Sequence, residues 1–343
     1  MAGRVYCTYF DHNYLSRGLA LHQSLQRHAP GSRLWVLCLS DEAYDVLGEL
    51  ALPDIVPIRM AEFEAAEPEV AATRASRTPV EYYFTCTPAW ILFVAARETE
   101  TEWITYLDGD LYFFQSPEAI YDELPDASVA IIPHRYPRQL EKRLLKFGIY
   151  NVGWVGVRRD EAGLAVAAWW RARCIEWCHD YVDGERFADQ RYLDSFPGLS
   201  NRVRVVDNVG ANLAPWNVGN YMIDVTAGKV MLDSATPLIF FHFQGLRKGL
   251  RWFVFNSHRY YRTPFPASVR RHVYQPYVQE LLEIEAKIEP ILPIATAAPQ
   301  KRFAVPDLKE SARAKLRSVV MFAIHLLDIV TGRAFLVWRG RAH

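Results

Sequence analysis

Residues 5–39 read VYCTYFDHNYLSRGLALHQSLQRHAPGSRLWVLCL, and this stretch decides the fold class. Val5–Phe10 is an apolar run typical of a strand, and Tyr14–His28 places its leucines at helical spacing. A Pro-Gly pair ends that helix, and Leu34–Leu39 is a second uninterrupted apolar strand. A strand, a helix and a strand in this order predict two parallel strands joined by a crossover helix.

The same alternation continues along the chain. A helix opens at Asp41, Ile55–Ile58 forms a short strand, and a long helix from about Pro88 to Arg97 precedes the next strand. We therefore expect an α/β protein with a doubly wound, Rossmann-like sheet covered by helices. Further strands are expected at Val129–Pro133, Asn151–Arg158, Val203–Val206 and Pro237–Phe243.

Composition narrows the classes of function. The chain has 343 residues, half of them hydrophobic, and a formal net charge of zero. A general nucleic-acid-binding protein needs a basic surface to displace counterions, so we expect no nucleic-acid partner. The five cysteines lack disulfide spacing, and the N-terminus enters a strand without a signal-peptide core. These features predict a cytoplasmic protein.

The pattern of residue types along the sequence changes near residue 256. We expect a main domain over residues 1–255, a linker and helical extension over 256–310, and an amphipathic basic helix over 311–343. The last part has an apolar stripe flanked by arginines, and it is too short and too charged to span a membrane. It fits a helix on the inner, anionic face of the cell membrane, while docking on the protein itself or a dimer contact stays open.

Two carboxylates separated by one glycine follow an apolar run that ends at Leu107. Asp108 and Asp110, at i and i+2 of an extended chain, project to the same side and can reach one divalent cation. Gly109 leaves room for a large anionic ligand to approach the backbone. An Asp-Gly pair is also common in β-turns, which is the competing interpretation.

A later apolar run offers a third ligand. His242 lies near the end of that run, at the edge where a parallel sheet places its ligand site. Gly245 allows close approach of the backbone, and Lys248 adds a cation that could neutralise a phosphate. We therefore predict a site for Mn²⁺ or Mg²⁺ formed by Asp108, Asp110 and His242 beside a bound diphosphate.

These segments resemble a known family. The run Asp108–Asp110 is similar to the metal-binding Asp-x-Asp motif of GT-A nucleotide-sugar glycosyltransferases. His242-x-x-Gly245-x-x-Lys248 resembles the C-terminal signature of the retaining family 8 galactosyl- and glucosyltransferases, which include lipooligosaccharide galactosyltransferases and glycogenin. That signature usually continues with Pro-Trp, where this chain has Gly-Leu. The resemblance spans about residues 5–252 and implies a GT-A-like mixed sheet, here with a C-terminal helical tail.

Three further segments fit the same resemblance. Asp11 and Asn13 stand where the family contacts uracil and ribose, although capping of a helix is an alternative role. Asn151 lies in a segment similar to the family's Phe-Asn-x-Gly strand, which implies a hydrogen bond to the donor sugar or the acceptor. Asp189 and Gln190 resemble the family's Asp-Gln pair near the reacting carbon, where they are catalytic; a helix start is the alternative.

The resemblance implies transfer of a sugar from a UDP-sugar to a glycan or lipid-linked acceptor, with retention of configuration and dependence on the cation. The whole chain also resembles bacterial proteins of surface polysaccharide assembly. An inverting enzyme is the nearest alternative and needs a carboxylate base, for which Asp189 or Asp207 is available. An inactive, membrane-attached scaffold is the alternative outside enzymes. A sugar-nucleotide pyrophosphorylase is disfavoured, because the first strand is not followed by a glycine-rich phosphate loop.

Overall fold

The computed structural model of the protein describes residues 4–248, 252–292, 334–338 and 340–342. Its strands are β1 Val5–Phe10, β2 Arg33–Cys38, β3 Ile55–Arg59, β4 Trp103–Leu107, β5 Leu111–Phe113, β6 Val129–Pro133, β7 Tyr150–Arg158, β8 Val203–Val205, β9 Ile223–Thr226, β10 Lys229–Leu232, β11 Thr236–Pro237, β12 Phe240–His242, β13 Leu246–Lys248, β14 Trp252–Phe255, β15 Ala334–Trp338 and β16 Arg341–Ala342.

The α-helices are α1 Leu15–His28, α2 Asp41–Leu50, α3 Met60–Ala66, α4 Pro68–Thr73, α5 Pro79–Arg97, α6 Glu118–Tyr121, α7 Leu144–Phe147, α8 Glu161–Glu176, α9 Phe196–Leu199, α10 Asn256–Tyr261, α11 Ala267–Val269 and α12 Gln275–Ile288. Short 3₁₀ turns are η1 His12–Tyr14, η2 Arg74–Ser76, η3 Arg138–Arg143, η4 Gln190–Ser195 and η5 Val218–Asn220, and η6 Arg270–Tyr274 is a π-helical turn.

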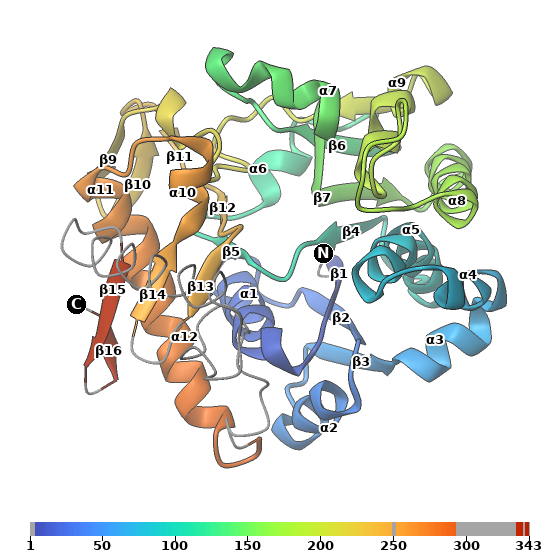
Figure 1. The fold of residues 1–343 in the computed structure, drawn as a ribbon, viewed down its shortest axis with the longest axis horizontal. Helices are drawn as coiled ribbons and strands as arrows, with labels where there is room; N and C mark the ends of the chain where they lie inside the picture. Colours follow the sequence, from blue (N-terminus) through green and yellow to red (C-terminus); the bar gives the residue numbers. More distant parts are fainter. Residues whose placement is uncertain (1–3, 249–251, 293–333, 339, 343) are drawn as a thin grey trace, which may run out of the picture.

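A seven-stranded mixed sheet forms the centre of the molecule, in the order β3-β2-β1-β4-β7-β6-β8. Strands β3, β2, β1 and β4 run parallel, whereas β7 is antiparallel to both of its neighbours, β4 and β6. Helices lie on both sides of this sheet (Figure 1). The α/β class with a doubly wound mixed sheet is therefore confirmed.

Alternate residues of each central strand point to opposite faces, so the sheet has a hydrophobic cluster on each side. In β2, Leu34 and Val36 join one cluster, while Trp35 and Leu37 join the other. The first cluster packs against α1, α2 and α12, and the second against α4, α5 and α8. Trp90 and Trp154 are among the fully buried side chains of these two clusters.

Helix α5 differs from its expected boundary. It begins at Pro79 rather than near Pro88, and Pro88 lies within it. Its start is fixed by a capping box, because Thr78 accepts from the Glu81 amide and the Glu81 carboxylate accepts from the Thr78 amide. Proline is well tolerated directly after such a cap. The Thr78-x-x-Glu81 spacing is the sequence signal that marks the true start.

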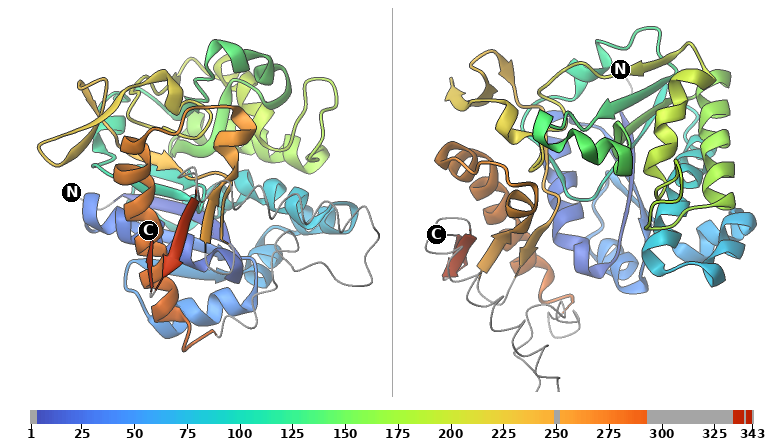
Figure 2. Two further views of the ribbon diagram at one scale, coloured as in Figure 1. Left: turned by 60° about the vertical axis from the view of Figure 1, so that its left-hand side comes forward. Right: turned by 45° about the horizontal axis from the view of Figure 1, so that its top comes forward.

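Two expectations near the C-terminus also change. The single strand expected at Pro237–Phe243 is two short strands, β11 and β12, which pair with different partners. Residues 334–338 and 341–342, expected to be helical, form β15 and β16, and β15 pairs with β14 (Figure 2). A β-prone run, Phe335-Leu336-Val337, explains the strand. The apolar stripe at 319–330 lies outside the described residues.

The segment after residue 256 packs onto the same core. Helix α12, which lies in the expected helical extension, runs from Gln275 to Ile288 and contributes Tyr277 and Leu281 to the cluster beside α1. Figure 2 shows α12 alongside α1. In the described part of the chain, no helix is long and apolar enough to cross a bilayer.

Candidate metal and sugar-nucleotide site

The residues between β4 and β5 form a turn rather than an extended strand end. The Leu111 amide donates to the Asp108 carbonyl at 3.2 Å, and the Asp108 amide donates to the Gly153 carbonyl of β7 at 2.9 Å. The turn and the carboxylate pair, which the sequence presents as alternatives, therefore occur together. The turn sets the directions of the Asp108 and Asp110 side chains.

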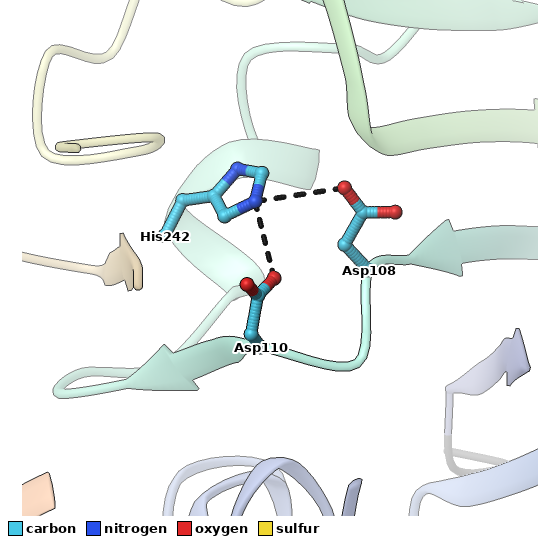
Figure 3. Close-up of side chains that lie close together, drawn as sticks. All are labelled: Asp108, Asp110 and His242. Atoms are coloured by element: carbon cyan, nitrogen blue, oxygen red, sulfur yellow. Dashed lines mark ion pairs between the residues drawn. The ribbon is translucent and has the colours of Figure 1, made fainter. Parts of the chain in front are cut away.

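His242 faces both carboxylates. Strand β12 pairs with β5 so that His242 lies opposite Leu111, directly beside the turn. Its Nε2 lies 3.1 Å from Asp110 Oδ1 and 3.5 Å from Asp108 Oδ2, as Figure 3 shows. One ligand atom from each of the three residues lies within 4.8 Å of the other two. We call these three residues the metal half of the site.

The charges of the metal half are strongly coupled. Burial raises the pKa of Asp108 above its ordinary value, against the nearby His242. For Asp110 burial acts in the same direction, but the charge and hydrogen bond of His242 outweigh it, so the pKa of Asp110 is lowered. Burial opposes protonation of His242, yet Asp110 and Asp108 together raise its pKa. The imidazole and the two carboxylates therefore favour one another's charged forms.

The donor set fits a divalent metal. Two carboxylate oxygens and one imidazole nitrogen suit Mn²⁺, and two carboxylates also suit Mg²⁺. The His242 side chain is 4% exposed and that of Asp110 11%, whereas that of Asp108 is 33% exposed. One side of the group is therefore open, which is the arrangement that an ion shared with a ligand needs.

Gly153 joins the metal half to a second group of polar residues. A Cβ at Gly153 would lie 2.8 Å from His242 Cε1 and Nδ1, and 2.7 Å from Asn151 Oδ1. The Gly153 amide donates to Asn151 Oδ1 at 3.2 Å. The absence of a side chain therefore lets β7 lie directly against His242.

Asn151, Asp189 and Gln190 lie together, and we call them the sugar half. Asn151 Nδ2 donates to Gln190 Oε1 at 3.1 Å, and Gln190 Nε2 donates to the Phe147 carbonyl at 2.7 Å. Both side chains are thus held in fixed directions. Asp189 precedes η4 but its side chain makes no capping hydrogen bond, so the structure does not use it as a helix cap.

The Asp189 carboxyl is buried and only 3% of the residue is exposed. Burial raises its pKa to about 7, with a further contribution from Asp108 and opposition from Thr87. Its Oδ2 has no hydrogen-bond partner among the described residues. Ala188, the preceding residue, has a φ of 48°, a conformation that a residue with a side chain rarely adopts. Strained backbone beside an unpartnered buried carboxyl is typical of functional sites.

Asp11 and Asn13 follow β1, whose carboxyl end lies beside that of β4 because the two strands are parallel. Asp11 accepts from the backbone and side-chain amides of Asn13, both at 3.0 Å, so it does cap η1. Asn13 is exposed. Capping does not prevent contact with a nucleotide, and that contact stays a prediction.

Gly245 and Lys248 lie on the strand hairpin after His242. Gly245 has a φ of +76°, and a Cβ there would lie 1.9 Å from Ser257 Oγ, so the turn requires glycine. Lys248 forms an ion pair with Glu285 of α12. Sequence reasoning missed Glu285, because nothing in the local pattern of α12 links it to a residue so far away in the chain.

Two further residues at the metal half were also missed. Tyr106 donates to Asp108 Oδ1 at 2.9 Å and so orients that carboxylate. Arg17 of α1 is 6% exposed, donates to the Leu246 carbonyl at 2.9 Å, and lies over the Tyr14 ring. Its positive charge contributes to the lowered pKa of Asp110. An arginine on a leucine-rich helix is the sequence signal that could have marked this buried charge.

Solved structures similar to the chain are glycosyltransferases. The galactosyltransferase LgtC, solved in complex with donor and acceptor sugar analogues, is 16% identical; the comparison covers 78% of this chain and 100% of that chain, with a TM-score of 0.47.

The sequence relatives are nearer. The chain is 31% identical over 304 residues to the uncharacterized protein YfnD of Bacillus subtilis (strain 168), covering 88% of this chain and 96% of YfnD. It is also 31% identical over 250 residues to the uncharacterized protein YfnF of the same strain, covering 71% of this chain and 81% of YfnF. A scan against models of protein families finds no match. The chain belongs to the family that includes YfnD and YfnF.

Proposed function

We propose that this protein is a metal-dependent glycosyltransferase that takes a sugar from a UDP-sugar and passes it to a glycan or lipid-linked acceptor. The observation that carries the proposal is the convergence of Asp108, Asp110 and His242 on one point at the edge of the sheet. A bare cluster of two acids and a histidine has little structural value, because it concentrates buried charge. Binding of a cation and a diphosphate would balance this charge.

The metal half would hold Mn²⁺ or Mg²⁺. When bound, the ion would act as a Lewis acid on the diphosphate of the leaving nucleotide. Tyr106 holds Asp108 in place from behind, and the buried Arg17 adds positive charge near Asp110. Lys248 would exchange Glu285 for a phosphate oxygen, which adds charge where the leaving group becomes more negative.

The sugar half would hold the transferred sugar. Gln190, fixed by Asn151 and the Phe147 carbonyl, presents a polar but weakly nucleophilic group to a sugar that becomes positively charged during transfer. Asp189 would accept hydrogen bonds from sugar hydroxyl groups through its unpartnered oxygen. Asp11 and Asn13 would contact the nucleoside, and Gly245 would let the backbone approach it.

Retention of configuration agrees with the poor nucleophilicity of the Gln190 side chain. In such a reaction a phosphate oxygen would take the proton of the acceptor. The raised pKa of Asp189, about 7, also suits a general base, which an inverting reaction needs. Product analysis by NMR distinguishes the two, because the anomeric coupling constant reports the configuration of the new bond. An inverted product would overturn the retaining assignment and leave glycosyl transfer standing.

A screen of UDP-, GDP- and dTDP-sugars for Mn²⁺-dependent hydrolysis tests the donor class. Asp108→Asn tests the metal half, and we expect it to lower the hydrolysis rate about thousandfold and to abolish Mn²⁺ binding measured by calorimetry. Asp126→Asn is the matched control, because Asp126 is exposed on the surface. Unchanged turnover in Asp108→Asn would remove the metal role. Absence of any hydrolysis in the wild-type protein would favour the inactive scaffold.

A further inference from the structure

The segment between β6 and β7 carries charge out of proportion to the rest of the chain. Residues 138–149 contain four basic residues and one acid, a formal charge of plus three (four less one), in a protein whose net charge is zero. Residues 138–147 of this segment form η3 and α7. Among the described residues, Lys142 and Lys146 make no ion pair with a carboxylate. The charges of Lys142 and Lys146 are therefore available to a partner outside the protein.

Exposed apolar side chains lie among these cations. Leu145 is 73% exposed and Ile149 46% exposed. Arg143 lies 4.3 Å from the ring centre of Tyr260 on α10, and Tyr260 is 59% exposed. We call Lys142, Arg143, Leu145, Lys146, Ile149 and Tyr260 together the α7 surface. Figure 1 shows α7 at the rim of the molecule, next to the start of β7.

The α7 surface is attached to the sugar half of the site. Gln190 Nε2 donates to the carbonyl of Phe147, the last residue of α7, at 2.7 Å. Phe147 also packs edge-on against Phe187, with ring centres 5.0 Å apart, two residues before Asp189. A molecule bound to the α7 surface is consequently close to the place where the sugar would be transferred.

The combination selects one class of partner. Basic side chains with nearby exposed leucine, isoleucine and tyrosine are suited to an anionic lipid bilayer, where the cations meet headgroups and the apolar tips enter the interface. A soluble polyanion would use the cations and leave the apolar side chains in water. From this pattern of charged and apolar side chains we infer that the α7 surface binds an anionic bilayer and directs the sugar half toward an acceptor carried on a lipid. The second part of this inference rests on the proposed transfer reaction.

The test compares two full-length double variants with equal changes of charge. Lys142→Glu with Leu145→Asp changes the α7 surface, and Lys229→Glu with Met222→Asp changes another exposed site; Met222 is 73% exposed, as is Leu145. Both variants retain the remainder of the sequence, so any binding by other segments is common to them. Binding is measured by flotation with vesicles of equal parts phosphatidylglycerol and phosphatidylcholine, and with vesicles of phosphatidylcholine alone.

We expect the wild-type protein and the Lys229/Met222 variant to bind the anionic vesicles equally and the α7 variant to bind about tenfold more weakly or less. Binding to phosphatidylcholine alone should be weak for all three. Equal binding of the α7 variant and the wild type, equal loss in both variants, or no binding by the wild type would overturn the inference. Wild-type binding to dextran sulfate but not to vesicles would assign the surface to a soluble polyanion and would also overturn it.

Hydrolysis of the donor without vesicles separates this inference from the proposed function. Both double variants should hydrolyse the UDP-sugar at the wild-type rate, because neither changes a residue of the metal half or the sugar half. If the wild-type protein hydrolyses no sugar nucleotide, the proposed reaction fails while the vesicle result still reports on the α7 surface. If hydrolysis is normal and vesicle binding is unaffected by the α7 variant, only the bilayer inference fails.

Discussion

The two halves of the site are built in different ways. In the metal half, Asp108, Asp110 and His242 are ionisable groups that interact with one another, and Asp110 and His242 are buried. In the sugar half, Asn151 and Gln190 are neutral amides already hydrogen-bonded to each other and to the backbone. The first group needs a cation to balance its charge, whereas the second is fixed before any ligand arrives.

Asp189 is the exception within the sugar half. It carries a buried carboxyl with an unpartnered oxygen, although the other two residues of the sugar half are neutral. The neutral residues of the site therefore fix side-chain positions. Buried charge that lacks a partner, which is energetically unfavourable, occurs in the groups that would touch the ligand. The following experiments test this division, beginning with the largest expected effect.

Asp189→Asn should remove a pH-dependent cost from the metal-free protein. The pKa of Asp189 is about 7 in the folded state and ordinarily 3.8, a difference of about three units. Between these values the unfolded chain releases the proton and the folded protein retains it, so stability falls as pH rises from about 4 to 7 and then stays constant. Three units correspond to about 4 kcal/mol in the free energy of unfolding.

Urea unfolding at pH 4.5 and pH 8 measures this effect. We expect the wild-type protein to lose several kcal/mol more than Asp189→Asn between about these two pH values. Parallel pH profiles for the two proteins would mean that the Asp189 carboxyl is ionised at little cost, and the distinction from its neutral neighbours would disappear.

Gly153→Ala should disrupt both halves at once. The new Cβ would lie 2.7 Å from Asn151 Oδ1 and 2.8 Å from the His242 ring, and a shift of the Gly153 backbone would disturb its hydrogen bond from the Asp108 amide. We expect a loss of about 1–3 kcal/mol in stability from overpacking and about a hundredfold loss of turnover.

Gly48→Ala is the control for this substitution, since a Cβ there meets nothing within 4 Å. It lies inside α2, where alanine is preferred to glycine, so stability should rise slightly. Normal Mn²⁺ affinity and turnover in Gly153→Ala would show that the two halves do not depend on their contact through β7.

Gln190→Ala should affect the sugar half alone. It removes the partner of Asn151 and the hydrogen bond to Phe147, so turnover should fall about tenfold or more while Mn²⁺ affinity measured by calorimetry stays the same. Gln275→Ala, at an exposed position of α12, is the control. A fall in Mn²⁺ affinity would contradict the separation of the halves.

Glu285→Gln should have the smallest effect. It releases Lys248 from a partly exposed ion pair, and such pairs contribute about 0.5–1 kcal/mol. The KM for the sugar nucleotide should therefore fall about threefold, because Lys248 no longer exchanges one partner for another. Glu283→Gln on the same helix is the control. A higher KM would indicate that Glu285 positions Lys248 for the phosphate rather than competing with it.

Much of the fold follows from local sequence pattern. The first three strands and α1 were predicted within a residue or two, because continuous apolar strands and a leucine-spaced helix are local signals. The predicted start of α5 near Pro88 was wrong, because the helix begins at Pro79 after the Thr78 cap and continues through Pro88. The tail was wrong over 334–342, where pairing with β14 decides the structure.

The part of the site that could be predicted from the sequence is its set of candidate metal-ligating residues. Asp108, Asp110 and His242 are recognisable by type and spacing, and the structure brings them together. Gly153 and Glu285 gain their importance from neighbours distant in sequence: Glu285 also accepts from Ser16 across 269 positions. No local pattern contains that information, because it depends on how α12 and β7 pack.

The antiparallel direction of β7 has a consequence for engineering. Because β7 runs against β4, its beginning, rather than its end, meets the turn at Asp108, so the connection that precedes β7 overhangs the site. That connection leaves and returns at neighbouring points: Pro133 pairs with Tyr150, and the His134 amide donates to the Ile149 carbonyl at 2.9 Å. Residues 135–146 can therefore be exchanged as a cassette between relatives, with the closing strands and Phe147, whose carbonyl accepts from Gln190, as a fixed frame, to test whether this connection governs acceptor choice.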